Sequence, residues 1–234
     1  MFYLVVLIFV AYVSLESLGG IARFGGFSAG YISIGVSLQN QILSLNRFIG
    51  FMIAPLVGFY VDTGGTSDDV FKIGLIGGFF GGGVLILVFL WWGGFSSFFR
   101  NISIAFVEDG YGIKAIIRGS KAEINVIKHR LQNIRLNYFI AQFITTGLAM
   151  PSVFLLNIVA IKVPEYSATL LQMTTLISGF GNLILNFYTN PLVAVEESKL
   201  TREEAESSHK SIFLGKIFGM LLLSPVIICS SLLI

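Results

Sequence analysis

Six apolar segments long enough to cross a lipid bilayer constrain this chain more than any other feature of its sequence. They cover residues 1–18, 31–61, 72–95, 136–161, 166–190 and 211–234. At about 1.5 Å of rise per helical residue, roughly 20 apolar residues span the hydrocarbon core. The chain has 55% hydrophobic and 12% charged residues, whereas an ordinary soluble domain carries about 25% charged residues. We therefore predict an all-α polytopic membrane protein with about six transmembrane helices in a single domain, residues 1–234.

Basic residues in the connections predict how these helices are oriented. Eleven Lys and Arg lie between segments 1 and 2, 3 and 4, and 5 and 6, whereas the alternate connections hold only Lys72 and Lys162. Cytoplasmic connections of membrane proteins carry an excess of basic residues. Both termini are therefore expected to face away from the cytoplasm.

The stretches that connect these segments give three further predictions. The stretch 101–134 is expected to be a loop whose second half, KAEINVIKHRLQNIR, forms a basic amphipathic helix in the membrane interface. Whether such a helix only anchors the protein or also gathers anionic substrate stays open. The pairs Gly19–Gly20 and Gly25–Gly26 favour a flexible turn. The stretch Glu196–Lys210 is interpreted as a solvated, charge-rich connection or a short helix, with His209 on the surface.

The second segment carries a stripe of polar residues at steps of 4, 3, 4 and 3, namely Ser33, Ser37, Asn40, Ser44 and Arg47. This spacing is close to the helical period, so the five side chains share one face. An arginine near the middle of a membrane helix costs from about 2.5 to over 10 kcal/mol unless it faces a partner or a watery cavity. We interpret Arg47 as an intramembrane site for an anionic group. The alternative, an arginine held internally to lock helix packing, stays open.

Other polar groups are candidates to line the same interior. Asn182, Asn186 and Asn190 recur at steps of four and share one flank of segment 5. Unpaired amides facing lipid would cost of order 1–3 kcal/mol each, so we expect them to face protein or a cavity. Interhelical hydrogen bonding and ligand contact are both consistent with this pattern. Glu16 and Asp62 are the carboxylates best placed to neutralise an unliganded Arg47.

Two longer stretches carry a resemblance to a known family. In IARFGGFSAGYISIGVSLQNQILSLNRFIGFMIAPLVGFYVD the matching residues are Arg23, Arg47, Ala54, Pro55, Leu56, Gly58 and Asp62. In VPEYSATLLQ they are Pro164, Glu165, Tyr166, Ala168, Thr169 and Gln172. These patterns resemble the Amj-type alternate lipid II flippases of bacteria, and the resemblance covers nearly the whole chain in order. The chain departs from the family at Gly50 and Ile53, where the family has Asn and Gln, and at Asn190, where it has Asp.

The resemblance implies a flippase of the bacterial cytoplasmic membrane. Such a protein translocates lipid II, the undecaprenyl-pyrophosphate-linked peptidoglycan precursor, from the inner to the outer leaflet. Arginine suits this task because its guanidinium grips two phosphate oxygens at once. The candidate substrate-binding residues are Arg47, Arg23, Asn40, Ser44, Asp62, Glu16, Asn182, Asn186 and Asn190. The expected partners are lipid II and membrane lipids, without nucleic acid, cofactor or metal, and a homo-oligomer stays open.

Two other classes of function compete with transport. A membrane enzyme acting on polyprenyl-phosphate lipids would need a base, a nucleophile or a carboxylate–Mg²⁺ cluster at the interface. The pair Asp68–Asp69 has no third ligand nearby in the sequence, and both histidines, His129 and His209, fall in charged connections. We therefore do not expect an enzyme. A scaffold protein would use the Arg47 stripe only for packing.

Overall fold

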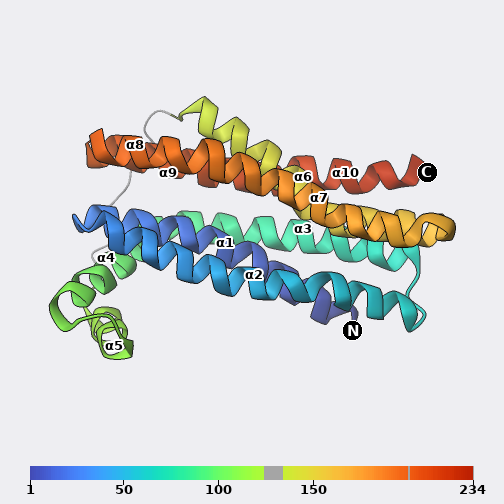
Figure 1. Ribbon diagram of the computed structural model, residues 1–234, viewed down its shortest axis with the longest axis horizontal. Coiled ribbons are helices and arrows are strands. Elements are labelled where there is room, and N and C mark those ends of the chain that lie inside the picture. Colours follow the sequence, from blue (N-terminus) through green and yellow to red (C-terminus); the bar gives the residue numbers. More distant parts are fainter. Residues whose placement is uncertain (124–133, 200, 234) are drawn as a thin grey trace.

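The computed structural model describes residues 1–123, 134–199 and 201–233, and this part of the chain is helical without a strand (Figure 1). Five helical stretches in it are long and apolar enough to cross a membrane: Phe2–Ser28, Ile32–Asp62, Ser67–Leu90, Leu136–Lys162 and Arg202–Leu233. The protein is therefore a multi-pass membrane protein. The predicted all-α polytopic fold is confirmed.

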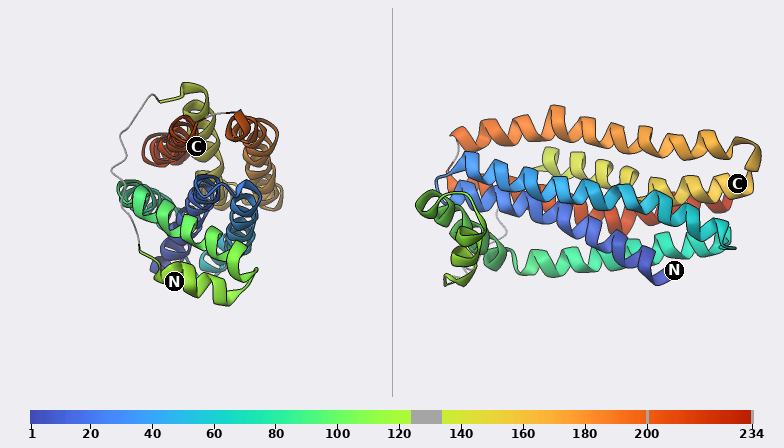
Figure 2. Two further views of the ribbon diagram at one scale, coloured as in Figure 1. Left: turned by 90° about the vertical axis from the view of Figure 1, so that its left-hand side faces the viewer. Right: turned by 60° about the horizontal axis from the view of Figure 1, so that its bottom comes forward.

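Six long helical runs correspond to the six predicted segments, but three of them extend past the predicted bounds, and the run that corresponds to 166–190 is not among the five stretches named above. The six runs are α1 (Phe2–Ser28), α2 (Ile32–Asp62), α3 (Ser67–Leu90), α6 (Leu136–Lys162), the run α7 (Ser167–Ile184), η2 (Leu185–Thr189) and α8 (Asn190–Lys199), and the run α9 (Arg202–Phe218), η3 (Gly219–Leu223), α10 (Ser224–Ser230) and η4 (Ser231–Leu233). The short turn η1 (Pro164–Tyr166) joins α6 to α7. The α7–η2–α8 run corresponds to the predicted segment 166–190 and lies along the length of the bundle (Figure 2).

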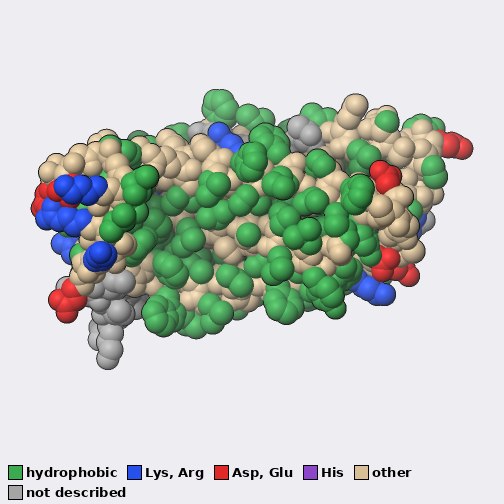
Figure 3. Space-filling model, turned by 90° about the horizontal axis from the view of Figure 1, so that it is seen from below, with side chains coloured by type: hydrophobic (Ala, Val, Ile, Leu, Met, Phe, Trp, Pro, Cys, Tyr) green, Lys and Arg blue, Asp and Glu red, His purple; other side chains and the backbone are tan. Residues whose placement is uncertain are grey.

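The two ends of the bundle differ in what they carry. Both termini and the α2–α3 connection lie at one end, and the α1–α2 and α8–α9 connections lie at the other, together with α5 (Figure 1). This is the parity expected of a chain that crosses six times. On the face shown in Figure 3, hydrophobic side chains cover the middle and most charged side chains gather toward the ends. Which end faces the cytoplasm stays a prediction.

The connection expected to be a loop is largely helical. It contains α4 (Trp92–Asp109), which packs on α1, and α5 (Ile113–Lys121). Arg118 of α5 pairs with Glu108 and Asp109 at 2.8 Å each. These pairs hold α5 against the end of α4.

The predicted interfacial helix at 121–135 falls mostly on residues 124–133, which lie outside the described residues. The helix α5 directly before it has the expected character. Three isoleucines on α5 are exposed beside three basic residues, namely Ile113, Ile116, Ile117, Lys114, Arg118 and Lys121. A basic amphipathic helix therefore lies directly before the stretch for which one was predicted, and the prediction for that stretch itself stays a prediction.

The glycine pairs expected to form a turn lie inside α1, so that prediction is wrong. The role of the second pair is close packing: a Cβ on Gly26 would lie 2.3 Å from the Cα of Gly35, and a Cβ on Gly25 would lie 2.5 Å from the Cβ of Phe99. Helices approach this closely only where a side chain is absent. The turn comes later, at Gly30, whose φ of 83° suits glycine.

The stretch Glu196–Lys210 is mostly helical, which is one of the two forms expected of it, but it is not solvated throughout. Helix α8 continues to Lys199, and α9 begins at Arg202 after a capping box in which Thr201 and Glu204 bond one another. The two helices carry Glu197, His209 and Lys210 into the bundle, whereas Lys199 and the charged residues at 202–204 are exposed. The side chain of His209 is 5% exposed, which corrects its expected place on the surface.

Candidate functional site

A polar cavity of ≈ 140 Å³ lies among α1, α2, α6, η2, α8 and α9. Four of these helices, α1, α2, α6 and α9, belong to stretches long and apolar enough to cross a membrane. The residues that line it are Tyr12, Glu16, Ser17, Gly20, Arg23, Gln39, Leu43, Asn46, Arg47, Gln142, Thr189, Asn190, Val193, His209, Ile212, Phe213 and Lys216. A cavity with this many polar walls inside a membrane bundle is the candidate functional site.

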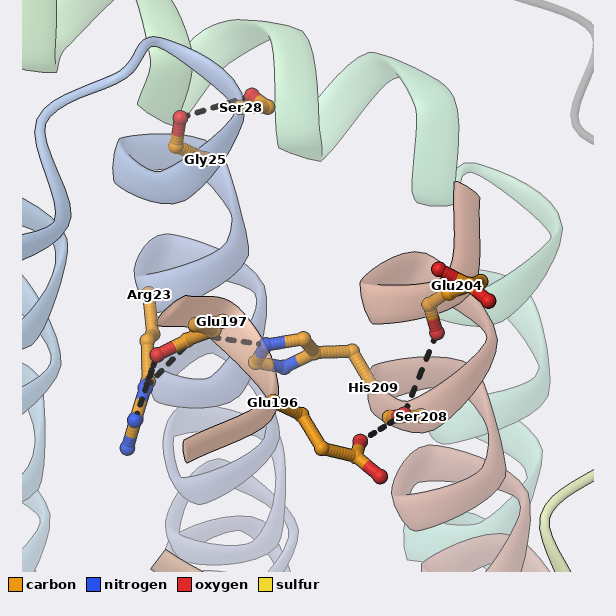
Figure 4. A network of polar contacts seen from close by, with 8 residues as sticks. All are labelled: Arg23, Gly25, Ser28, Glu196, Glu197, Glu204, Ser208 and His209. Carbon is orange, nitrogen blue, oxygen red and sulfur yellow. Dashed lines mark hydrogen bonds and ion pairs between the residues drawn. The ribbon is translucent and has the colours of Figure 1, made fainter. Parts of the chain in front are cut away.

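The deepest cation of the cavity is Arg23 of α1, which is bound to Glu197 of α8 (Figure 4). Nη2 and Nε of the arginine donate to the carboxylate at 2.7 and 3.0 Å, and Nε2 of His209 lies 3.0 Å from Glu197 Oε1. All three side chains are buried. The cluster joins α1, α8 and α9 at the wall of the cavity, which Arg23 and His209 line.

Glu197 is held in its ionised form by these contacts. It lies beyond the apolar segment 166–190, and burial by itself raises its pKa. The hydrogen bonds from His209 and Arg23 act in the opposite direction and outweigh burial, so the pKa of Glu197 lies below its ordinary value. Arg23 therefore faces a charged partner.

The neighbouring carboxylate, Glu196, ties α8 to two other elements. It accepts a hydrogen bond from Ser208 of α9 at 2.5 Å and forms an ion pair with Arg135 at the start of α6. Figure 4 shows Glu196 and Glu197 pointing to different partners. The two adjacent carboxylates thus hold α8 against three helices.

A second ion pair lies on another wall of the cavity. Nζ of Lys216 in α9 lies 2.7 Å from Oε1 of Glu16 in α1. Glu16 was expected to neutralise Arg47, and in the structure it pairs with Lys216 instead. The third cation, Arg47, lines the cavity with an exposed side chain and forms no ion pair within the described residues. Arg47 is therefore the uncompensated positive charge of the site, and the buried arginine is Arg23.

Three buried polar atoms of the lining have no hydrogen-bond partner in the described part of the chain. They are Asn46 Oδ1 of α2, Gln142 Oε1 of α6 and Thr189 Oγ1 of η2. Their residues are 4%, 0% and 2% exposed. Buried polar groups are almost always paired, so these three atoms are exceptions in the wall of the cavity.

The wall formed by η2 and α8 has an irregular backbone. Pro191, the second residue of α8, cannot donate a backbone hydrogen bond, and its ring crowds the carbonyl of the preceding turn. This accounts for the π-helical geometry of η2 directly before it. The wider turn brings Thr189 and Asn190 to the cavity.

The structure brings together four of the residues predicted from the sequence. Arg23, Arg47, Glu16 and Asn190 all line the cavity. Asn182 and Asn186 belong to α7 and η2, but their side chains lie outside the described part. Asp62 is exposed as the last residue of α2 and does not line the cavity.

The polar stripe of α2 shares one face, as the spacing predicted, but that face points outward. Ser33, Ser37, Asn40 and Ser44 line a shallow groove that is separate from the cavity. Asn40 and Ser44 are exposed, and their predicted place at an interior site is wrong. The interior face of α2 is offset from the stripe and presents Gln39, Leu43 and Asn46, with Arg47 beside them.

Sequence reasoning missed several residues of the site, above all Glu197, His209 and Lys216. A usable signal was present. Thr189, Val193 and Glu197 recur at steps of four and are all buried, so a helix extended past the apolar run would have carried Glu197 inward. The capping pattern of Thr201 and Glu204 likewise places the start of the last helix before His209.

Comparisons with protein-family models, with curated proteins and with solved structures give no match for this chain.

Proposed function

We propose that this protein is an Amj-type flippase of the bacterial cytoplasmic membrane, which moves lipid II from the inner to the outer leaflet. The observation that carries the proposal is the cavity in the bundle, lined by three cations of which Arg47 is uncompensated. A site for a pyrophosphate within a membrane needs buried or half-enclosed positive charge. The family resemblance of the Arg47 and Pro164–Gln172 stretches points to the same substrate.

The three cations differ in how readily they meet an anion. Arg47 is exposed and unpaired within the described residues, so its guanidinium can bind two phosphate oxygens without breaking another contact. Arg23 and Lys216 are each held by a carboxylate. An anion reaching them would compete with Glu197 and Glu16. We therefore assign first contact with the pyrophosphate to Arg47.

The size of the cavity limits what it encloses at one time. A protein cavity of about 150 Å³ holds a molecule the size of benzene, and this cavity measures ≈ 140 Å³. One sugar ring or one small anionic group fits, whereas a disaccharide with its peptide does not. The remainder of the headgroup would extend past the exposed Arg47, and the polyprenyl tail would stay in the lipid.

The test is transport in cells stripped of their other lipid II flippases. Expression of this protein should restore growth and should make lipid II accessible to a lipid II-cleaving enzyme added outside the cells. An empty vector and an unrelated multi-pass protein expressed at the same level serve as controls. Full expression in the membrane without growth and without outer-leaflet lipid II would refute the proposal.

The contact between His209 and Glu197 favours a second candidate, an enzyme acting on polyprenyl-phosphate lipids. A histidine oriented by a carboxylate is a common acid–base pair, and His209 also lines the cavity. Purified protein incubated with a polyprenyl pyrophosphate would then release phosphate, and His209→Gln would abolish the release. Turnover that depends on His209 would favour the enzyme over the flippase.

A further inference from the structure

We propose that His209 is a proton-binding site in the wall of the cavity, and that an anion bound in the cavity takes up a proton with it. The inference rests on the proposed function, because it adds a second ligand, the proton, to the same anion site. The acceptor is the imidazole ring of His209. Binding of the headgroup would then depend on the pH of the side from which it enters.

His209 lies between a buried carboxylate and the cavity. Its Nε2 lies 3.0 Å from Oε1 of Glu197, and its ring centroid lies 5.4 Å from that of Phe24. Figure 4 shows Arg23 and His209 approaching Glu197 from opposite sides. His209 is 5% exposed and nevertheless lines the cavity. The ring is therefore shielded from bulk water but lies within reach of whatever occupies the cavity.

The carboxylate of Glu197 determines which nitrogen of His209 takes up the proton. An ionised carboxylate only accepts hydrogen bonds, so the imidazole nitrogen that faces it must carry a hydrogen. That nitrogen is Nε2. A proton taken up from solution is therefore added at Nδ1, and the neutral ring becomes an imidazolium. This adds one positive charge to the wall without breaking the contact between His209 and Glu197.

The charges around His209 oppose that extra positive charge when the cavity holds no anion. Glu197 favours the imidazolium, but the cations of the wall outnumber its carboxylates. The charged and titratable groups that line the cavity or contact His209 are Tyr12, Glu16 and Arg23 of α1, Arg47 of α2, Glu197 of α8 and Lys216 of α9. The lining residues of α6 and η2, Gln142 and Thr189, are uncharged.

On the helix of His209 itself, the neighbouring Lys210 pairs with Glu206 at 2.7 Å. Three cations, Arg23, Arg47 and Lys216, thus share the wall with two carboxylates, Glu16 and Glu197. A neutral His209 leaves one positive charge in excess, and an imidazolium would leave two. Like charges at short distance disfavour the charged form.

An anion in the cavity reverses this balance. An opposite charge within about 4–6 Å favours the charged form of a titratable group by a factor of about 10 or more. Because a cavity of ≈ 140 Å³ encloses one small group, an anion inside it lies close to His209 as well as to Arg47. Linkage between two ligands is reciprocal. The protonated protein should therefore bind the anion at least about 10-fold more tightly than the protein with a neutral His209.

The test needs an anion whose own charge does not change with pH. A pyrophosphate diester with one prenyl chain and one methyl group keeps a single, strongly acidic proton on each phosphorus. It is therefore a dianion throughout the range in which histidine titrates, about pH 5 to 8. Binding of this diester is measured with the full chain in phosphatidylcholine nanodiscs.

The affinity of the wild type should fall about 10-fold or more as the pH rises through this range, because His209 loses its proton. His209→Gln can still donate a hydrogen bond to Glu197 but does not titrate, so its affinity should not change with pH. The matched control is His129→Gln, which removes the chain's other histidine and should keep the pH dependence of the wild type. A histidine that only holds helices together would not move this profile.

Calorimetry of the wild type in two buffers of different ionisation enthalpy counts the protons taken up on binding, and it serves as the test if His209→Gln does not yield folded protein. We expect net proton uptake. Binding without proton uptake and without pH dependence would overturn the inference and leave the flippase proposal standing. A pH dependence that persists in His209→Gln, or that is lost in His129→Gln, would also overturn it. Failure of the dianion to bind at any pH would overturn the proposed function and the proton site with it.

Discussion

Arg23 and Glu197 are 174 residues apart in the chain and meet in a buried ion pair with an Nη2–Oε2 distance of 2.7 Å. Their side chains are 6% and 1% exposed. The pair joins α1, near the start of the chain, to α8, near its end. It therefore links the two halves of the sequence at the wall of the cavity.

Breaking this pair from one side should destabilise the protein. Arg23→Met leaves Glu197 buried without its main cation, and Glu197→Leu leaves Arg23 buried without its carboxylate. Each substitution should therefore lower the free energy of unfolding by about 3–5 kcal/mol. The double variant removes both charges and should cost much less than the sum of the two. Thermal unfolding of the purified protein in one detergent measures all three, and strictly additive losses would contradict the coupling.

Arg47 should behave in the opposite way. It is exposed and has no ion pair in the described residues, so Arg47→Ala should leave membrane abundance unchanged. Losing a charge-assisted hydrogen bond of about 1.5–3 kcal/mol should lower transport roughly 10- to 100-fold. Arg47→Lys keeps the charge but loses the fork geometry of the guanidinium. Its transport rate should therefore lie between that of the wild type and that of Arg47→Ala.

The matched control for Arg47 is Arg202→Ala, which removes another exposed arginine that does not line the cavity. Immunoblots of membranes and growth of flippase-depleted cells are read side by side. Normal growth with Arg47→Ala at normal abundance would rule out Arg47 as the anion site. Loss of abundance would instead assign it to helix packing.

The crossing of α1 and α2 depends on Gly26 and Gly35. A Cβ on Gly26 would lie 2.3 Å from the Cα of Gly35, and a Cβ on Gly35 would lie 2.5 Å from the carbonyl oxygen of Arg23. Gly35→Ala should therefore push the helices apart and lower stability by about 1–3 kcal/mol. Gly58→Ala in the same helix meets nothing within 4 Å and should be neutral or slightly stabilising. Equal melting temperatures for both variants would contradict the close crossing.

The orientation in the membrane is tested by cysteine labelling. Cys229 is exposed and is the chain's one cysteine, so the experiment starts from Cys229→Ser. Asp68 and Ser120 are exposed and lie in α3, after the α2–α3 connection, and in α5 at the opposite end of the bundle. An impermeant thiol reagent on intact cells should label Asp68→Cys and not Ser120→Cys. The reverse pattern would invert the predicted topology.

The sequence determined the helical fold and the approximate positions of the long helices. A helix that crosses the bilayer needs a continuous apolar segment of about 20 residues, which can be read locally along the chain. Spacing also identified which side chains of α2 share a face. It could not tell which way that face points, because the helical period is the same whether a stripe faces the lipid or the interior. Asn40 and Ser44 were therefore assigned to the interior, whereas the packing of α2 on α1 turns them outward.

Only the tertiary structure decided which charges meet. Arg23, Glu197 and His209 come from three helices, and their distances depend on how α8 and α9 continue beyond the apolar runs. No local pattern in the sequence encodes that Lys216 forms an ion pair with Glu16, whereas Arg47 has no carboxylate partner among the described residues. Pairing of buried charges is set by the contacts between helices, which the periodicity of a single helix does not contain.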